Sequence, residues 1–171
     1  AKLAAEDASV ADIFRSNNDS VARSYCADTQ AMFEQHPAER VCVTGDVAEI
    51  VKCHWRLPGR TDSDVTAEDL MGLLKIGNHP FLLGAMQRWL QQAGTPSISL
   101  LDLFCWEQMA GRWQSQIRAE YDLAQDSFAP LNCRSLLVLM LGVAEDKRRS
   151  PEFVFFRDVI EALWPETLAE P

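Results

Sequence analysis

The chain has little of what metal-binding, disulfide-rich and nucleic-acid-binding proteins are built from. Its 171 residues include five cysteines, none of them in a Cys-x-x-Cys pair, and three histidines without the i, i+4 spacing of a helical metal site. Neither a disulfide framework nor a zinc site is therefore indicated. The 16 basic residues are outnumbered by 25 acidic ones, and the net charge of −9 opposes binding to a phosphate backbone. We expect no nucleic-acid partner.

Membrane and export signals are also missing from the sequence. No apolar run approaches the roughly 20 residues that a membrane-spanning helix needs, and the N-terminal residues include Asp and Glu where a signal peptide would be basic and then apolar. These features predict a cytoplasmic protein with no membrane partner. The sequence also lacks G-x-S-x-G, G-x-x-x-x-G-K-S/T and G-x-G-x-x-G, the patterns of common hydrolases and nucleotide-binding loops.

Apolar residues at helical spacing are what the sequence does have. They make up 47% of the chain, with five Trp and eight Phe, which is enough for one core and predicts a single domain over residues 1–171. We predict a mainly α-helical domain of about seven helices with one short β-strand. The expected helices cover about residues 4–15, 20–35, 66–75, 80–92, 99–123, 136–143 and 151–163, and a further helical pattern covers 47–56.

Several turn and capping signals divide these helices. An Asn-Asn-Asp turn is expected at 17–19 and a polar linker at 57–64. Thr66, followed by acids in the first helical turn, is the expected cap of one helix, and His79 before Pro80 is the expected cap of the next. Gly94 should end that second helix, and Asn132 can cap the helix at 136–143.

Residues 40–44 are the one clear strand candidate, because they form a short β-branched run that stops at Gly45. A single strand cannot make a sheet, and its backbone groups would be costly if they were buried without partners. This strand is therefore expected to pair with another chain or with a part missing from this one.

The segment after this strand is the first candidate for chemistry. Thr44, Gly45, Asp46 and Glu49 lie where the strand hands over to a helical pattern. Glycine lets the backbone approach a phosphate, and the free N–H groups of a helix start can bind it. The two acids would repel a phosphate unless Mg²⁺ mediates, which makes Asp46 and Glu49 candidate metal-side residues. The alternative is an ordinary helix cap at Thr44 or Asp46, with Glu49 in a capping box.

The expected helix at 99–123 is the second candidate. Trp106, Met109 and Trp113 share its apolar stripe, Arg112 lies at the edge of that stripe, and Gly111 lies on the opposite side. A glycine inside a helix costs about 1 kcal/mol relative to alanine, which suggests close approach by a backbone or a ligand. The alternative is a helix that packs on two sides, with Arg112 paired to a neighbouring carboxylate.

The third candidate is the elbow at Pro130, which leads to Arg134 in the first turn of the next helix. A positive charge at a helix N-terminus is unfavourable, so Arg134 should be compensated either by an acid or by an anionic ligand. Asp122 and Asp126 are the acids closest to it in the sequence.

Together these segments resemble the C-terminal half of the asparagine-synthetase-like ATP pyrophosphatases, a branch of the PP-loop superfamily. Residues 44–49 resemble a shortened Ser-Gly-Glu-Gly-x-Asp-Glu motif, and residues 128–134 resemble an E-x-R-x-P-F-L-D elbow. Residues 106–113 and 163–166 resemble the Trp-Glu-x-Arg-Met-Gly-Arg-Trp helix and the terminal Leu-Trp-Pro-Glu segment of bacterial relatives. The resemblance covers about residues 40–170, so residues 1–39 are expected to form separate N-terminal helices ahead of an asparagine-synthetase-like region at 40–171.

Departures from the family pattern shape what the resemblance implies. Val47 stands where the family has a glycine near phosphate, and Met109 and Ala110 stand where the bacterial relatives have Arg and Met. The family's phosphate-binding Ser-Gly-Gly-x-Asp-Ser loop and its N-terminal cysteine glutaminase are nowhere in the chain. The resemblance therefore implies a partner, which is either a missing N-terminal nucleotide-binding half or another chain that pairs with strand 40–44.

Roles for single residues follow from the same resemblance. The implied cofactors are ATP and Mg²⁺, used to activate a carboxylate as an acyl-adenylate for amide formation. Thr44 and Gly45 would lie near the pyrophosphate, and Asp46 and Glu49 would act through Mg²⁺. Arg112 or Arg134 would steady an anionic group. The chain would not be catalytic alone, and the alternative is a non-catalytic helical interaction module derived from that family.

Overall fold

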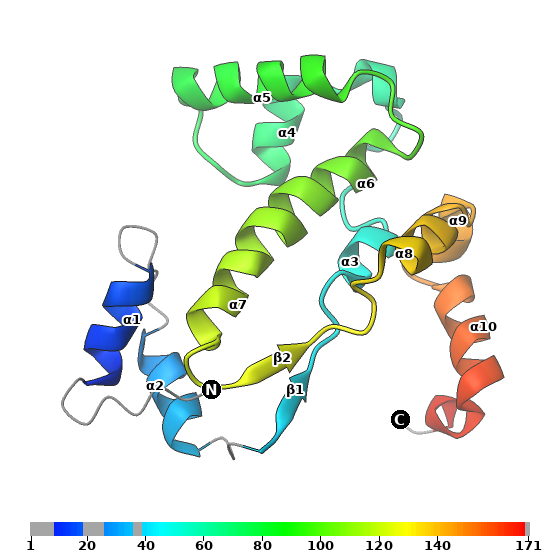
Figure 1. Cartoon of the computed structure of the whole chain (residues 1–171). Coiled ribbons are helices and arrows are strands. Elements are labelled where there is room, and N and C mark those ends of the chain that lie inside the picture. Colours follow the sequence, from blue (N-terminus) through cyan, green and yellow to red (C-terminus); the bar gives the residue numbers. More distant parts are fainter. Residues whose placement is uncertain (1–8, 19–25, 36–38, 170–171) are drawn as a thin grey trace. The chain divides into compact units, whose positions relative to one another are not determined.

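The structure is a computed structural model that describes residues 9–18, 26–35 and 39–169 (Figure 1). It is mainly helical, as predicted. The chain divides into two compact units, of which the first comprises Ala1–Val47 and Gln108–Cys133 and the second comprises Ala48–Glu107 and Arg134–Pro171. Among the described residues, no helix has the length and apolar character needed to cross a membrane.

Helices α1 (Val10–Asn18) and α2 (Cys26–Gln35) of the first unit both contact α7 (Ser115–Tyr121). Phe14 is almost fully buried in this unit, and the Thr29 hydroxyl donates a hydrogen bond of 3.4 Å to the Glu120 carbonyl oxygen. Asn17 and Asn18 belong to α1, so the turn predicted there was wrong at these two positions. The predicted helical residues 4–8 and 20–25 lie outside the described part of the chain.

The first unit also holds a small parallel sheet. Strand β1 (Val41–Val43) pairs with β2 (Asp126–Phe128), and Val43 lies opposite Phe128 (Figure 1). The expectation that β1 would find no partner within the chain was therefore wrong. Strand β2 is three residues long and contains Phe128 as its single strand-favouring residue, so its signal in the sequence is weak.

The core of the second unit lies between α4 (Ala67–Leu73), α5 (Pro80–Ala93) and α6 (Leu100–Phe104). Its fully buried members are apolar side chains from all three helices: Ala67, Leu70, Met71, Met86, Leu101 and Phe104. The predicted caps are confirmed. The Thr66 side chain accepts from the Asp69 amide in a capping box, and the His79 side chain accepts from the Phe81 amide. Gly94 follows α5 with a positive φ of 57°, as a helix end often requires.

The long helix predicted at 99–123 is interrupted. After α6 the chain winds as a π-helix (η3, Cys105–Gln114) and then continues as α7. Hydrogen bonds in a π-helix span five residues rather than four, so an i, i+4 ridge does not keep to one face there. Cys105 and Met109 are buried, whereas Trp113 is 41% exposed. The apolar stripe predicted to include Trp113 is therefore exposed at that residue.

Shorter elements complete the second unit. They are α3 (Ala48–Val51), a 3-10 turn η2 (Asp62–Asp64), α8 (Arg134–Leu141), α9 (Glu145–Arg148), α10 (Val154–Leu163) and a second 3-10 turn η4 (Pro165–Leu168). The helix predicted at 47–56 is thus a single turn. Helix α8 starts at Arg134, earlier than the predicted start at Leu136. Within the predicted linker, Asp62 accepts a hydrogen bond of 2.8 Å from the Leu100 amide at the start of α6.

A buried ion pair joins three of these elements. Arg148 of α9 donates to Asp102 of α6 over 2.9 Å, and both side chains are only 2% exposed. Its other nitrogens donate to the carbonyl oxygens of Val51 and Val143 over 2.9 Å and 2.8 Å. One arginine therefore ties α9 to α6, to the end of α3 and to the segment after α8.

Candidate functional site

The parallel pairing of β1 and β2 brings the carboxyl ends of both strands to one edge of the sheet. Thr44 to Asp46 follow β1 there, and Ala129 to Cys133 follow β2. The Thr44 amide donates a 2.9 Å hydrogen bond to the Phe128 carbonyl oxygen, which continues the pairing by one residue. All these residues lie in the first unit. We call this site the carboxyl edge, because ligands of α/β sheets bind outside the carboxyl ends of the strands.

Asp46 is held in place at the carboxyl edge by two side chains. The Thr44 hydroxyl donates to its Oδ2 over 3.1 Å. Arg118 of α7 places Nε 2.5 Å from the same oxygen and donates through Nη2 to Oδ1 over 3.4 Å. The sequence analysis missed Arg118, because it lies 72 residues from Asp46 and no local pattern links the two. The carboxyl edge thus contains an acid whose negative charge is compensated by Arg118, rather than an unpaired acid.

Gly45 leaves the backbone of the carboxyl edge open. The residue is exposed, and among the described residues other than its two chain neighbours no atom lies within 4 Å of the position that a Cβ would take. A ligand could therefore contact the main chain here without displacing any protein atom. This is the property that the sequence suggested for Gly45, since close approach to a phosphate needs a position without a side chain.

Val47 adopts a backbone conformation that favours glycine. Its φ is 76°, in the left-handed region, which is a genuine outlier for a β-branched residue. Such strain often occurs at ligand-binding segments.

Because the backbone at Val47 is strained, a glycine variant should be more stable than an alanine variant at this position, which is the reverse of the order in a helix. Val47→Gly should be more stable than Val47→Ala by about 1 kcal/mol, because only glycine adopts this φ without steric cost. Chemical denaturation of both variants gives the difference. At Val51, which lies in a helix, the same pair should rank in the opposite order by a similar amount. A more stable alanine variant at both positions would contradict the strained backbone.

The remaining predicted site residues are distributed over both units. Glu49 belongs to the second unit, where its Oε2 is buried and has no hydrogen-bond partner among the described residues. Arg112 lies in the first unit and Arg134 in the second, and both are exposed. Neither arginine forms an ion pair with a described residue, so the acid compensation expected as one alternative for each is not found.

The capping and metal alternatives can be compared with this geometry. Helix α3 begins at Ala48, which puts Val47, rather than Thr44 or Asp46, at the position of a cap. Asp46 is paired with Arg118, whose positive charge opposes the approach of Mg²⁺. No group of three or more His, Cys, Asp or Glu side chains within residues 9–18, 26–35 and 39–169 is arranged to hold a metal ion. A role of Asp46 or Glu49 toward Mg²⁺ stays a prediction.

Known protein families, curated proteins and solved structures include no match to this chain.

Proposed function

We propose that this chain forms the helical C-terminal side of an asparagine-synthetase-like enzyme that uses ATP to activate a carboxylate for amide formation. One observation carries this proposal. A parallel sheet of two strands leaves one face uncovered, with Val41 53%, Val43 68% and Phe128 58% exposed. Parallel sheets are normally covered on both faces and occur inside larger α/β structures. The uncovered face is therefore what a nucleotide-binding half would cover.

The partner in this proposal also extends the sheet. Within the described chain β1 has a single neighbour, β2, so its second edge is available to another strand. Pairing at residues 40–44 would hold a phosphate-binding loop beside the carboxyl edge, where loops of neighbouring parallel strands meet. This arrangement supplies the loop that the sequence lacks. It also gives a reason for apolar side chains on an exposed strand, which are otherwise a liability.

The carboxyl edge is better suited to bind the phosphates of ATP than to bind Mg²⁺. Gly45 gives a phosphate access to the main chain, while the charge of Arg118 is compensated by Asp46, so the phosphate contact proposed here is to the backbone. Mg²⁺ needs only one or two carboxylates when the nucleotide supplies the other oxygens. Asp46 could join it only by giving up Arg118. The chain's own residues are therefore assigned to bind and orient phosphate.

The reaction proposed for the complete enzyme has two steps. The acceptor's carboxylate oxygen attacks the α-phosphorus of ATP, pyrophosphate leaves, and an acyl-adenylate forms. A nitrogen donor then attacks the acyl carbon, and AMP leaves with the bonding electrons as the amide forms. In this proposal the carboxyl edge binds the pyrophosphate portion and stabilises its charge, which is how proteins mainly assist phosphoryl chemistry. The chain alone should release no pyrophosphate.

Replacing Gly45 with alanine separates binding from folding. Since nothing lies near the added Cβ and the φ of Gly45 is not in the left-handed region, Gly45→Ala should change the free energy of unfolding by less than about 0.5 kcal/mol. It should nevertheless abolish the rise of several degrees in melting temperature that saturating Mg-ATP is expected to give the unmodified chain. Thermal melting with and without Mg-ATP measures both effects.

Gly77→Ala is the matched control. The added Cβ again meets no neighbouring atom of the described residues, and Gly77 lies in the second unit, away from the carboxyl edge in the sequence. It should keep the full response to Mg-ATP. A response retained by Gly45→Ala, or lost equally in both variants, would contradict phosphate binding at the carboxyl edge.

A non-catalytic interaction module is the second candidate function. Helices α8 and α10 favour it, because neither is fully covered within the described chain. Val138 and Leu139 of α8 are 56% and 72% exposed, and Leu163 and Trp164 at the end of α10 are 80% and 65% exposed. Exposed apolar clusters mark interaction sites. An unmodified chain that does not respond to Mg-ATP would favour this candidate over the enzyme.

A further inference from the structure

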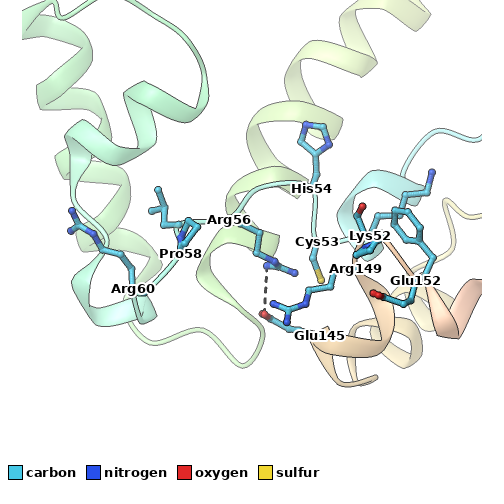
Figure 2. Close-up of a pocket in the computed structure, with 14 residues that line it drawn as sticks. Lys52, Cys53, His54, Arg56, Pro58, Arg60, Glu145, Arg149 and Glu152 are labelled. Carbon is cyan, nitrogen blue, oxygen red and sulfur yellow. Dashed lines mark ion pairs between the residues drawn. The ribbon is translucent and has the colours of Figure 1, made fainter.

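We propose that the second unit contains a separate pocket that binds a small molecule through a phosphate group. The pocket has a volume of about 700 Å³ and lies between residues 52–60 and 145–153, as Figure 2 shows. This volume is within the usual range for ligand pockets. None of the residues predicted from the sequence to bind ATP or Mg²⁺ lines it. Binding of a ligand in this pocket would therefore be additional to the function proposed above.

The charge of the pocket is opposite to that of the chain. Lys52, Arg56, Arg60 and Arg149 line it, against the two acids Glu145 and Glu152, whereas the whole chain has a net charge of −9. Lys52 and Arg149 form no ion pair with any described residue. Arg60 already forms an ion pair, because its Nη1 lies 3.2 Å from Oδ2 of Asp69. The positive charge without an acidic partner among the described residues thus comes from Lys52 and Arg149, while Arg56 is paired with Glu145.

Arg56 has hydrogen-bond donors without acceptors. Its Nη1 donates to the Trp55 carbonyl oxygen over 3.3 Å and lies 3.5 Å from Oε2 of Glu145, the contact dashed in Figure 2. Its Nε and Nη2 are buried and have no partner among the described residues. These two nitrogens form one edge of the guanidinium, the edge that binds phosphate or carboxylate with two parallel hydrogen bonds. Leaving such donors unpaired is costly, so an acceptor that reaches them is favoured.

The two walls of the pocket are fixed by contacts around it. Arg148, next to the lining residue Arg149, donates to the Val51 carbonyl oxygen beside Lys52. Cys53 and Phe153, one in each wall, have positive φ values of 54° and 46°, which non-glycine residues rarely adopt. A fixed pocket loses less entropy on binding than a mobile one does. The backbone segments that carry Lys52 and Arg149 are therefore joined before any ligand enters.

The number of acceptor oxygens favours a phosphate monoester as the ligand. The two unpaired nitrogens of Arg56 would use two acceptor oxygens, which is all that a single carboxylate has. A phosphate monoester has three acceptor oxygens, so one remains for Lys52 or Arg149. The volume exceeds what phosphate alone would fill, so the ligand has a further uncharged part.

Isothermal titration calorimetry of the full chain with inorganic phosphate, at constant ionic strength, tests this proposal. Arg149→Gln and Lys52→Gln should each weaken phosphate binding about tenfold or more, as expected for the loss of a charge-assisted contact. Arg157→Gln removes an exposed charge from the same unit outside the pocket, and it should change the dissociation constant less than about twofold. Circular dichroism confirms that each variant is folded.

Three outcomes would overturn the proposal. One is the absence of a binding signal up to about 10 mM phosphate. Another is an equal loss in the Arg157 variant, which would indicate a general charge effect. The third is a loss of phosphate binding in Gly45→Ala with normal binding in Arg149→Gln, which would place phosphate at the carboxyl edge. Succinate, a dicarboxylate, should bind more weakly than phosphate, and equal binding would contradict the assignment of a phosphate group.

Discussion

Arg148→Met is expected to lower the free energy of unfolding by about 3–5 kcal/mol, because it leaves a buried carboxylate without its partner. Asp102 and Arg148 are both 2% exposed, and Arg148 also supplies donors to the Val51 and Val143 carbonyl oxygens. All three acceptors would lose their hydrogen bonds at once. Urea denaturation at neutral pH, with the unmodified chain as reference, measures the loss.

The size of this loss should depend on pH. Burial raises the pKa of the Asp102 carboxyl, while the bond to Arg148 opposes that rise. Without Arg148 the opposition disappears, and the folded pKa lies further above the unfolded value. A raised folded pKa means that stability is lost as pH increases through it, so the variant should be more stable at about pH 5 than at about pH 7 relative to the unmodified chain.

The double variant Arg148→Met with Asp102→Leu is the control for the ion pair. It removes both charges, and its stability should recover a large part of the loss, since apolar pairs often replace buried ion pairs without net cost. The Val51 and Val143 carbonyl oxygens would still lack their donor, so recovery should be incomplete. If Arg148→Met alone changed the free energy of unfolding by less than about 1 kcal/mol, that result would contradict the buried ion pair.

Cys105 is expected to react with a thiol reagent about a thousandfold more slowly than an exposed cysteine. Burial, helped by the negative charges of Asp102 and Glu49, raises the pKa of the Cys105 thiol from its usual 9.0 to about 12. The thiolate is the reactive form, and three pH units correspond to about a thousandfold less of it at a given pH. Cys133 is exposed and should react much faster than Cys105. Alkylation of the native chain at about pH 8, followed by peptide mass spectrometry, gives both rates.

The same pKa affects stability in alkaline solution. The folded pKa of Cys105 exceeds the unfolded value, so its contribution is intact below pH 9.0 and is lost as pH rises toward about 12. Cys105→Ala should therefore lose less stability than the unmodified chain over that interval. Reaction of Cys105 at the same rate as Cys133 in the native protein would contradict the burial of this thiol.

Local signals in the sequence predicted the parts of the fold that local physics determines. Thr66 with Asp69, and His79 with Pro80, are pairs within three residues whose hydrogen bonds need no distant partner, and both helix starts are confirmed. Gly94 ends α5 for the same reason. The mainly helical class follows from apolar spacing, which the core of α4, α5 and α6 bears out.

Contacts between distant residues were beyond the reach of this reasoning. Strand β2 pairs with β1, and in Asp126-Ser127-Phe128 only Phe128 favours a strand. The partner of Asp46, Arg118, lies 72 residues away, and that of Asp102, Arg148, lies 46 residues away. An isolated charged residue in a helix gives no sign of which acid it will meet. Sequence reasoning thus located Thr44, Gly45 and Asp46 of the candidate site. It did not find Arg118, which pairs with Asp46.

The π-helix shows a different limit. The spacing of Leu101, Cys105, Met109 and Trp113 fits a regular α-helix, yet the hydrogen bonding changes at Cys105. Helical-wheel reasoning assumes 3.6 residues per turn, so it cannot reveal a segment that departs from that value. Such segments often lie at functional sites. Here the change follows the buried Phe104 and precedes the exposed residues 111–113.

The central claim is that the carboxyl edge binds the phosphates of Mg-ATP, and hydrogen exchange with peptide mass spectrometry tests it most directly. With saturating Mg-ATP, exchange should slow in the peptides that cover residues 43–47 and 128–133, because a bound phosphate shields their backbone amides. Peptides that cover α4 and α5 should exchange as before. Unchanged exchange at 43–47, or slowing confined to 52–60 and 145–153, would contradict the account.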